Sequence, residues 1–386
     1  MSSAGDTVQS LNAVTTDALT LITQLEAVVS NVASQKQIGA SSEAARAAEE
    51  LVAANGSLDA LSLAHDSAAL IKAHATKISL LIINEPFTPT AITKVLRELV
   101  AGPVPSLAAA TQLCAARRYT QTIQRDLAWR AGRVLKELKD LLSQIPRNGK
   151  VLSNSQKNAS AGAAEGRGSI ITTGVLWSAC DDLTTFAKRG FGGNLAHTVD
   201  QLRDTLKDVM EELKEWGEEQ DEDEDHHDSG GDNDDVAQVT SISGTDDAQA
   251  ILDDLMNSQQ RIPRDDPNKI RERLESCLRR LRMTTLLYQA ATKRRLKPLA
   301  HAAPVSASDI PARLDEVMAL LKRIPERFGS LALAFYELEP SEIDRLMDEC
   351  FFDAFAVSEL LAKPWDGQKD EFTDWAMRFQ VEIKKG

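Results

Sequence analysis

The chain has 386 residues, 42% of them hydrophobic, 5% aromatic and 26% charged, and its formal net charge is −14. The apolar fraction is ordinary for a globular protein, and scarce aromatic residues beside abundant alanine and leucine favour helices packed on helices over a sheet. Nothing in this balance suggests a strongly basic nucleic-acid binder, and no apolar run approaches the roughly 18 residues of a membrane span.

The first half of the chain is predicted to be helical, because apolar residues recur there at intervals of three and four. A turn at Pro86 and Pro89 separates two of the segments, with Thr88 placed to cap the second helix and Pro89 suited to its first position. The predicted helices cover residues 11–32, 44–54, 58–83, 92–99, 107–145, 170–188 and 195–216.

Two stretches interrupt this helical pattern. Residues 147–169 are rich in serine, asparagine, glycine and alanine and have little apolar content, so we predict a flexible linker there. Residues 191–194 (Phe-Gly-Gly-Asn) are predicted to form a loop. Both stretches fall inside one helical bundle, which is expected to span residues 8–216.

An acidic run follows at residues 218–235, with eleven acids, no lysine or arginine and no apolar residue. Such a run cannot bury enough surface to offset the entropy of ordering it, and we expect residues 217–245 to be a disordered linker. The run contributes −11 of the net charge of −14 and leaves about −3 for the remaining chain. The folded body is therefore expected to be nearly neutral.

The rest of the chain returns to helical spacing and is expected to form a second helical part over residues 246–384, packed on the first. Its predicted helices cover residues 246–256, 268–293, 308–325, 331–336, 341–361 and 372–383. Long amphipathic helices joined by short turns pack as antiparallel bundles. The predicted fold class is therefore all-α, with long antiparallel helices in two parts separated by a disordered acidic loop.

Groups that could perform chemistry are scattered along the sequence. The four cysteines are far apart and have no paired spacing, which indicates free thiols packed as small apolar groups in a reducing compartment. They are Cys114, Cys180, Cys277 and Cys350. No strand precedes the glycine-rich residues 190–193, and His226 and His227 lie among carboxylates without the spacing of a cation-binding loop. We predict no catalytic residue, no cofactor and no metal, and hence a protein that is not an enzyme.

The candidate for partner binding is the basic helix at residues 268–293, where we predict that Arg279, Arg280 and Arg282 contact a partner. The acidic run could instead fold over these arginines, or it could simply be solvated. Residues 293–297 (Lys-Arg-Arg-Leu-Lys) resemble a nuclear-import signal, although cations at a helix end that face its dipole explain the cluster better.

Five motifs occur in a fixed order along the chain. Residues 80–87 read Leu-Leu-Ile-Ile-Asn-Glu-Pro-Phe, and residues 175–181 read Val-Leu-Trp-Ser-Ala-Cys-Asp. The tract rich in Asp, Glu and His comes next, then the basic, cysteine-containing residues 274–283 and the apolar residues 331–336, which end in tyrosine. In this order the motifs resemble the cyclin-D-binding protein family, also called the Grap- and cyclin-D-interacting proteins. The resemblance is collinear over residues 11–363, apart from the linker at 147–169, and does not include the final helix.

The resemblance implies an all-helical, two-part interaction protein of the cytoplasm and nucleus. Animal members bind D-type cyclins and helix-loop-helix regulators and damp cell-cycle entry. The implied partners are therefore cyclin-like or helix-loop-helix proteins, with no direct nucleic-acid contact and no membrane. Leu176, Trp177 and Cys180 of the tryptophan motif are expected to be core residues. The long helices alone leave an alternative, a cytoskeletal adaptor bundle of the vinculin or talin-rod type.

Overall fold

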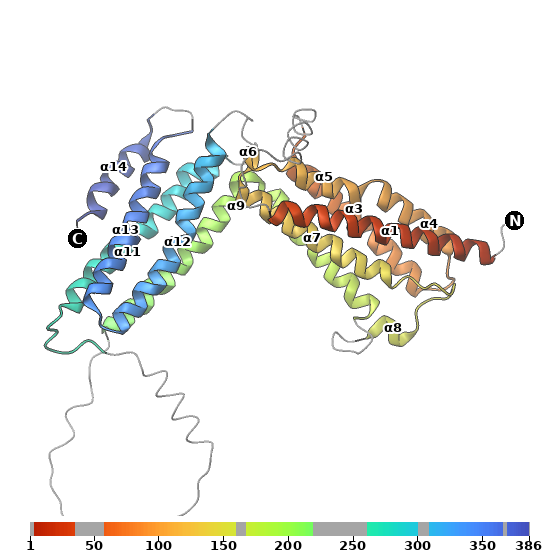
Figure 1. Ribbon diagram of the computed structural model, residues 1–386, viewed down its shortest axis with the longest axis horizontal. Coiled ribbons are helices and arrows are strands. Elements are labelled where there is room, and N and C mark those ends of the chain that lie inside the picture. The colour runs from red at the N-terminus through yellow and green to blue at the C-terminus, as the bar shows by residue number, and fades with distance from the viewer. Residues whose placement is uncertain are drawn as a thin grey trace, which may run out of the picture. The chain divides into compact units, whose positions relative to one another are not determined.

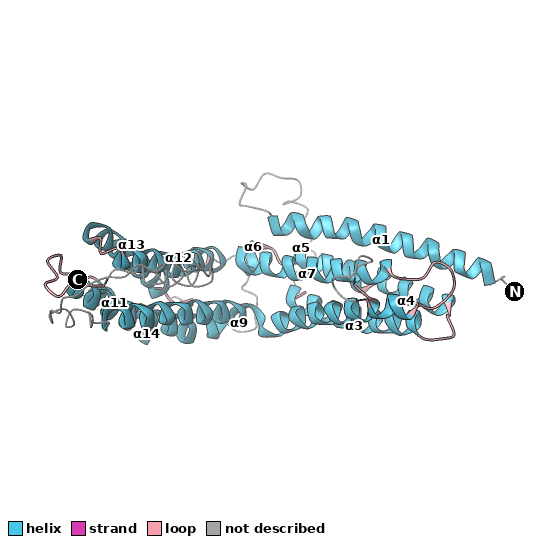
Figure 2. Cartoon of the chain, turned by 90° about the horizontal axis from the view of Figure 1, so that it is seen from below, coloured by secondary structure: helices cyan, strands magenta, loops and turns pink. Residues whose placement is uncertain are grey.

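The computed structural model describes residues 4–34, 58–159, 167–218, 261–299, 309–365 and 369–385. These residues form helices joined by loops and include no strand (Figure 2), so the all-α prediction is confirmed. Contacts divide the chain into two compact units. Unit 1 comprises Met1–Ala196 and Leu296–Asp315, and unit 2 comprises His197–Arg295 and Glu316–Gly386.

Unit 1 is a bundle of long helices. Its elements are α1 (Ala4–Ser34), α3 (Ala60–Ile83), α4 (Pro89–Ala101), α5 (Pro103–Leu113), α6 (Ala116–Tyr119), α7 (Gln121–Ser143), α8 (Asn154–Asn158) and the first part of α9 (Ser169–Glu218). Helix α1 packs along α7 and against α4 and α5, while α3 packs against α4, α5 and α7 (Figure 1). The apolar residues that recur at helical spacing along α7 are all buried: Ile123, Leu127, Val134, Leu138, Leu141 and Leu142.

A buried tyrosine fixes the start of α3. The Tyr119 hydroxyl accepts a hydrogen bond from the Ala60 backbone N–H at 3.0 Å and donates one to Asp59 at 2.7 Å. The same Asp59 carboxylate caps α3 by accepting a hydrogen bond from the Ser62 N–H at 2.9 Å. Tyr119 and Asp59 thereby satisfy two N–H donors at a helix end that lack intrahelical partners.

The segment 147–169, predicted to be a flexible linker, carries structure in its described residues. Helix α8 lies within it and begins at a capping box made by Ser153 and Gln156. The Leu152 backbone N–H donates to the Ile82 carbonyl at 2.9 Å, and Arg167 pairs with Glu137 at 3.1 Å. The prediction considered only the low apolar content, whereas these polar contacts attach both ends of the segment to the bundle.

Helix α9 bends at one residue. Gly190 has φ 71° and ψ −177°, a conformation essentially restricted to glycine. The Asn194 side-chain amide donates to the carbonyls of Phe186 and Gly190 at 2.7 and 2.8 Å and satisfies groups that the bend releases from the helix. The predicted loop at residues 191–194 is therefore wrong, since those residues are helical.

The boundary between the units also differs from the predicted one. It lies inside α9, between Ala196 and His197, rather than in the predicted linker at 217–245. Residues 219–260, with nearly all of the acidic run, lie outside the described residues, and so do the helices predicted at 44–54 and 246–256.

Unit 2 combines the end of α9 with α11 (Ile270–Ala291), most of α12 (Ile310–Tyr336), α13 (Pro340–Ala362) and α14 (Glu371–Ile383). Helix α13 packs against α11 and α14 (Figure 1). The ring of Trp216 on α9 packs against Phe335 and Tyr336 of α12. Helix α12 runs through Pro325 and joins the predicted segments 308–325 and 331–336 in one helix. The proline removes one backbone hydrogen bond, but Phe328 in the following turn is fully buried and keeps the helix packed.

All four cysteines are free and buried, which confirms the prediction that they pack as small apolar groups. Cys114 and Cys180 belong to unit 1, and Cys277 and Cys350 belong to unit 2. Burial raises the pKa of each of the four thiols. Among the described helices, none is long and apolar enough to cross a membrane.

Candidate interaction surfaces

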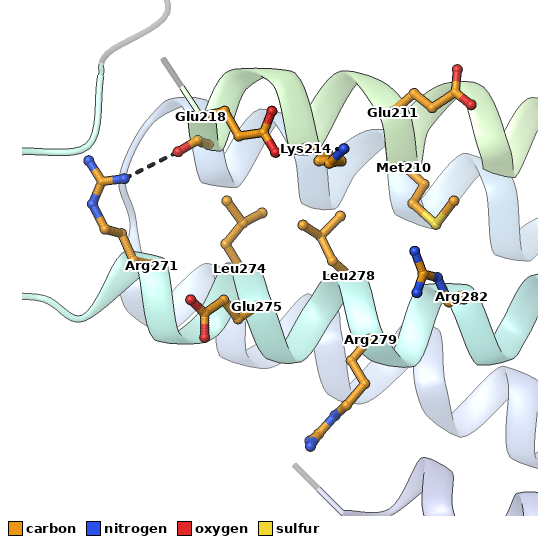
Figure 3. Close-up of a pocket in the computed structure, with 11 residues that line it drawn as sticks. Met210, Glu211, Lys214, Glu218, Arg271, Leu274, Glu275, Leu278, Arg279 and Arg282 are labelled. Carbon is orange, nitrogen blue, oxygen red and sulfur yellow. Dashed lines mark hydrogen bonds and ion pairs between the residues drawn. The ribbon is translucent and has the colours of Figure 1, made fainter. Parts of the chain in front are cut away.

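A groove in unit 2 runs between the last turns of α9 and helix α11, with a cavity volume of about 520 Å³. Leu274 and Leu278 project from α11 toward α9, and Met210 of α9 lies near them (Figure 3). Gly217 allows this close approach, because a Cβ there would overlap the Leu274 side chain. Charged residues surround this apolar floor: Glu211, Lys214, Glu218, Arg271, Glu275, Arg279 and Arg282.

Two arginines of the groove are already engaged by main-chain carbonyls. Arg271 donates to the Gly217 carbonyl at the end of α9, with an N–O distance of 3.2 Å (Figure 3). Arg279 points away from α9 (Figure 3). It donates to the Lys385 carbonyl just beyond α14 at 3.1 Å. Carbonyls at helix ends lack intrahelical donors and carry partial negative charge. Both arginines therefore hold helix ends in place.

The three arginines predicted to bind a partner occupy three different environments. Successive residues of a helix are about 100° apart, so Arg279 and Arg282 border the groove while Arg280 turns into the unit. Arg282 extends along the groove beside Met210 (Figure 3). Arg280 is 8% exposed, and its guanidinium lies 3.8 Å from the centroid of the Phe351 ring. Their joint role in partner binding stays a prediction.

The centre of the basic cluster at 293–297 is buried. Arg295 lies in a π-helical turn, Thr292–Leu296, and its side chain is 2% exposed. It forms two hydrogen bonds to Asp370, at 2.5 and 2.9 Å, and donates Nε to the Leu361 carbonyl at 2.8 Å. The Arg295 hydrogen bonds hold the pKa of the Asp370 carboxyl well below its ordinary value. Arg295 therefore serves the packing of α13 and α14 and not an exposed basic patch.

The tryptophan motif of α9 is divided between core and surface. Leu176 and Cys180 are buried, as predicted. The prediction that Trp177 is a core residue is wrong, because its side chain is 38% exposed. Its indole N–H donates to the Thr76 hydroxyl at 3.0 Å, which fixes the ring against α3. Trp177 is displaced from Leu176 by about 100° around the helix, so it lies at the edge of the buried face.

Polar contacts join α3 to α9 on both sides of the tryptophan. The Thr173 hydroxyl donates to the Ser79 hydroxyl at 2.9 Å. Further along, the Lys72 ammonium donates to the Asp181 carboxylate at 2.6 Å. The residue number rises along α3 as it falls along α9, so the two helices pack antiparallel. The two contacts hold Trp177 beside α3.

Apolar residues accompany Trp177 at the surface. Ile170, Gly174 and Trp177 recur at i, i+4 and i+7 on one side of α9, and Leu80 lies one turn beyond Thr76 on α3. Ile170 and Leu80 are both about half exposed, and no described atom lies within 4 Å of a Cβ added at Gly174. We call these four residues the Trp177 face. The sequence pattern did not locate this face, although a glycine in mid-helix was an available signal.

Titratable side chains do not converge on a metal centre in the described part of the chain. No group of three or more His, Cys, Asp or Glu residues there could hold a metal ion. His226 and His227, which were considered as a weak cation site, lie outside the described residues.

Comparison with known proteins concerns the segment that contains the Trp177 face. Residues 64–219 match the family described as Grap2 and cyclin-D-interacting, N-terminal. An uncharacterized protein of Schizosaccharomyces pombe is 26% identical over 238 residues, which cover 61% of this chain and 62% of the yeast protein. The matched part thus spans less than two thirds of that relative. The resemblance seen in the sequence motifs is confirmed over residues 64–219, where the chain is similar to the Grap2 and cyclin-D-interacting family.

Proposed function

We propose that this protein is a non-enzymatic helical interaction protein that regulates the cell cycle or transcription by binding other proteins. The family match over residues 64–219 supports this proposal, because the family description names cyclin D as an interacting partner. The partner class is a D-type cyclin or a helix-loop-helix regulator. The cytoplasm and nucleus are the compartments in which such binding would act.

The observation that carries the proposal is the Trp177 face, which lies wholly within the matched residues. Tryptophan is enriched among the residues that carry most of the binding energy in interfaces. Because Trp177 is held by its hydrogen bond to Thr76, little side-chain entropy would be lost when a partner covers it. The open space at Gly174 suits the apolar side of a partner helix, a common mode of recognition.

Isothermal titration calorimetry of the whole chain with a purified D-type cyclin, and with a helix-loop-helix protein, tests the proposal. Trp177→Ala should weaken binding by at least about tenfold, because truncating an anchor tryptophan typically costs 2 kcal/mol or more. Trp129→Ala is the matched control, since Trp129 is also exposed but belongs to α7. Circular dichroism establishes that both variants keep their helices.

Two results would count against this function. One is that neither partner binds the wild-type chain, and the other is that Trp177→Ala binds as tightly as the wild type. Co-sedimentation of the chain with actin filaments, in place of cyclin binding, would favour the cytoskeletal adaptor.

A further inference from the structure

A second hollow in unit 2 lies among α11, α13 and the end of α14, with a cavity volume of about 710 Å³. Arg280 of α11 and Lys384 at the end of α14 contribute cationic groups to its wall. Phe351 and Phe352 of α13 contribute aromatic rings. The hollow is therefore a different surface from the α9–α11 groove and lies outside the family-matched residues.

Arg280 is the unusual member of this wall. Its guanidinium lies over the Phe351 ring, yet the Nε atom is buried without a hydrogen-bond partner, and no ion pair of the described residues includes Arg280. Burial lowers the pKa of Arg280, against the influence of Asp348. A guanidinium has five N–H donors, and leaving one of them, here the Nε–H, unsatisfied in a buried position is costly. A ligand that accepts hydrogen bonds would remove this cost.

The other arginines of the hollow are neutralised by acids. Arg323 and Arg327 both pair with the buried Asp353, with N–O distances of 2.5 and 2.9 Å. Arg327 also pairs with Glu349 at 3.4 Å. These two cations and two acids balance, so they supply no net attraction for an anion.

The remaining charges leave one positive charge in excess. Arg280 and Lys384 stand against a single acid, Asp348. The Lys384 ammonium lies 4.1 Å from the centroid of the Phe355 ring, so it too faces an aromatic surface. A singly charged carboxylate balances this excess, whereas a doubly charged phosphate would exceed it and be repelled by the neighbouring acids.

An apolar surface adjoins these cations. Phe352 is 69% exposed, the largest value among the large hydrophobic residues that the structure describes. Its neighbour Phe351 is only 2% exposed and gains the free energy of burying an apolar ring, whereas Phe352 does not. A ligand that covers Phe352 therefore needs an apolar group close to its negative charge.

We propose that this hollow binds a peptide segment of a partner protein in which an aspartate or glutamate stands beside a large apolar residue. The carboxylate accepts hydrogen bonds from Arg280, a geometry that a planar guanidinium favours. The apolar side chain covers Phe352. The chain's own acidic run at 218–235 contains carboxylates but no apolar residue and so does not supply both groups. This inference does not depend on cyclin or helix-loop-helix binding at the Trp177 face.

Fluorescence anisotropy of the whole chain with a fluorescein-labelled, terminally blocked peptide of alternating glutamate and leucine tests the proposal. The same peptide with glutamine in place of glutamate should bind at least tenfold more weakly. Arg280→Met should weaken binding of the glutamate peptide at least tenfold. It should leave the Tm unchanged or raised, because it removes a buried, unpaired charge and keeps the packing on Phe351. Arg282→Met, on the groove side of the same helix, should bind like the wild type.

Phe352→Ser provides a second test that does not depend on a buried position. Because Phe352 is exposed, this variant should fold normally and bind the glutamate peptide several-fold more weakly. Equal binding of the two peptides, or wild-type affinity in both Arg280→Met and Phe352→Ser, would overturn the proposal. Binding that appears only after residues 219–235 are deleted would assign the hollow to the chain's own carboxylates and would overturn it as well.

Discussion

A single carboxylate, Asp370, joins the start of α14 to the turn that follows α11. It caps α14 by accepting a hydrogen bond from the Thr373 N–H at 3.0 Å, and it receives two hydrogen bonds from Arg295. The guanidinium is almost fully buried, whereas the Asp370 side chain is 43% exposed, so solvent partly screens the pair and reduces its contribution to stability. Two elements distant in the sequence therefore depend on one ionised group.

Replacing Asp370 with Asn should destabilise unit 2 in a pH-dependent manner. Asparagine keeps the capping function and removes the charge, so we expect a loss of about 1–2 kcal/mol at pH 7. The folded pKa of Asp370 lies below the ordinary value of 3.8. The stabilisation is therefore complete above the unfolded pKa, and it is lost as the pH falls through the folded pKa. Urea unfolding from pH 7 to pH 3 should show the difference between wild type and D370N shrinking below about pH 4.

The control for D370N is Glu371→Gln, because Glu371 is 84% exposed and pairs only at the surface with Arg294. That variant should unfold like the wild type throughout the pH range. A difference between D370N and wild type that stays constant with pH would contradict the assigned role of the charge.

Burial of single residues could be predicted only in part. Cys277, Arg280 and Thr284 recur on one side of α11, so the buried position of Arg280 was available from spacing. In α1 the apolar spacing through Val14 and Leu21 indicates the buried face only in part, because Thr15 and Ile22 are buried in their place. The exposure of Trp177 could not be predicted, because it depends on the position of Thr76 on a different helix.

At the scale of elements, the conformation of two glycines determines where α9 bends and where it stays regular. Gly190 makes the bend, whereas Gly174 lies in regular helix on the exposed side. The two residues occur in one helix and differ in conformation, so the same substitution should have opposite effects at the two positions.

Gly190→Ala should destabilise the protein by about 1–3 kcal/mol, because an alanine would be forced into a backbone conformation that only glycine adopts readily. Gly174→Ala, the matched control, should be neutral or stabilise by up to about 1 kcal/mol, because alanine is the better helix former and the space is open. Urea unfolding followed by circular dichroism measures both. Equal effects at the two sites would show that the bend is not required.

Helices were predicted better than the breaks between them. The apolar line of α7 followed from spacing alone, because that helix buries one continuous face. Pro325 lies between two predicted segments of α12, and the packing of Phe328 outweighs the hydrogen bond that the proline removes. The segment 147–169 was predicted to be a flexible linker. Contacts such as that of Arg167 with Glu137 join residues too far apart in the sequence for a local pattern to reveal.

At the scale of the whole molecule, composition predicts a disordered acidic run, which lies outside the described residues, but it does not indicate which helices pack together. The predicted division at residues 217–245 followed the charge, whereas the compact units divide inside α9. A helix continuous in sequence gives no local sign that its two ends belong to different cores. Long-range packing is what sets this boundary.

Deleting residues 219–235 should change the free energy of unfolding by no more than about 1 kcal/mol. The segment contains no apolar residue, so it has little to bury against either unit. A variant of equal length with serine and glycine in place of the acids separates the effect of charge from that of length. Urea unfolding of all three chains provides the measurement, and a loss of several kcal/mol in either variant would show that the segment packs on the folded body.

The four buried cysteines can report how fast the helices around them open. Alkylating reagents attack the thiolate, which burial suppresses, so labelling waits for a local opening of the surrounding helices. Two thiols belong to each unit, and peptide mapping after timed labelling would therefore give a separate opening rate for each half without any added probe.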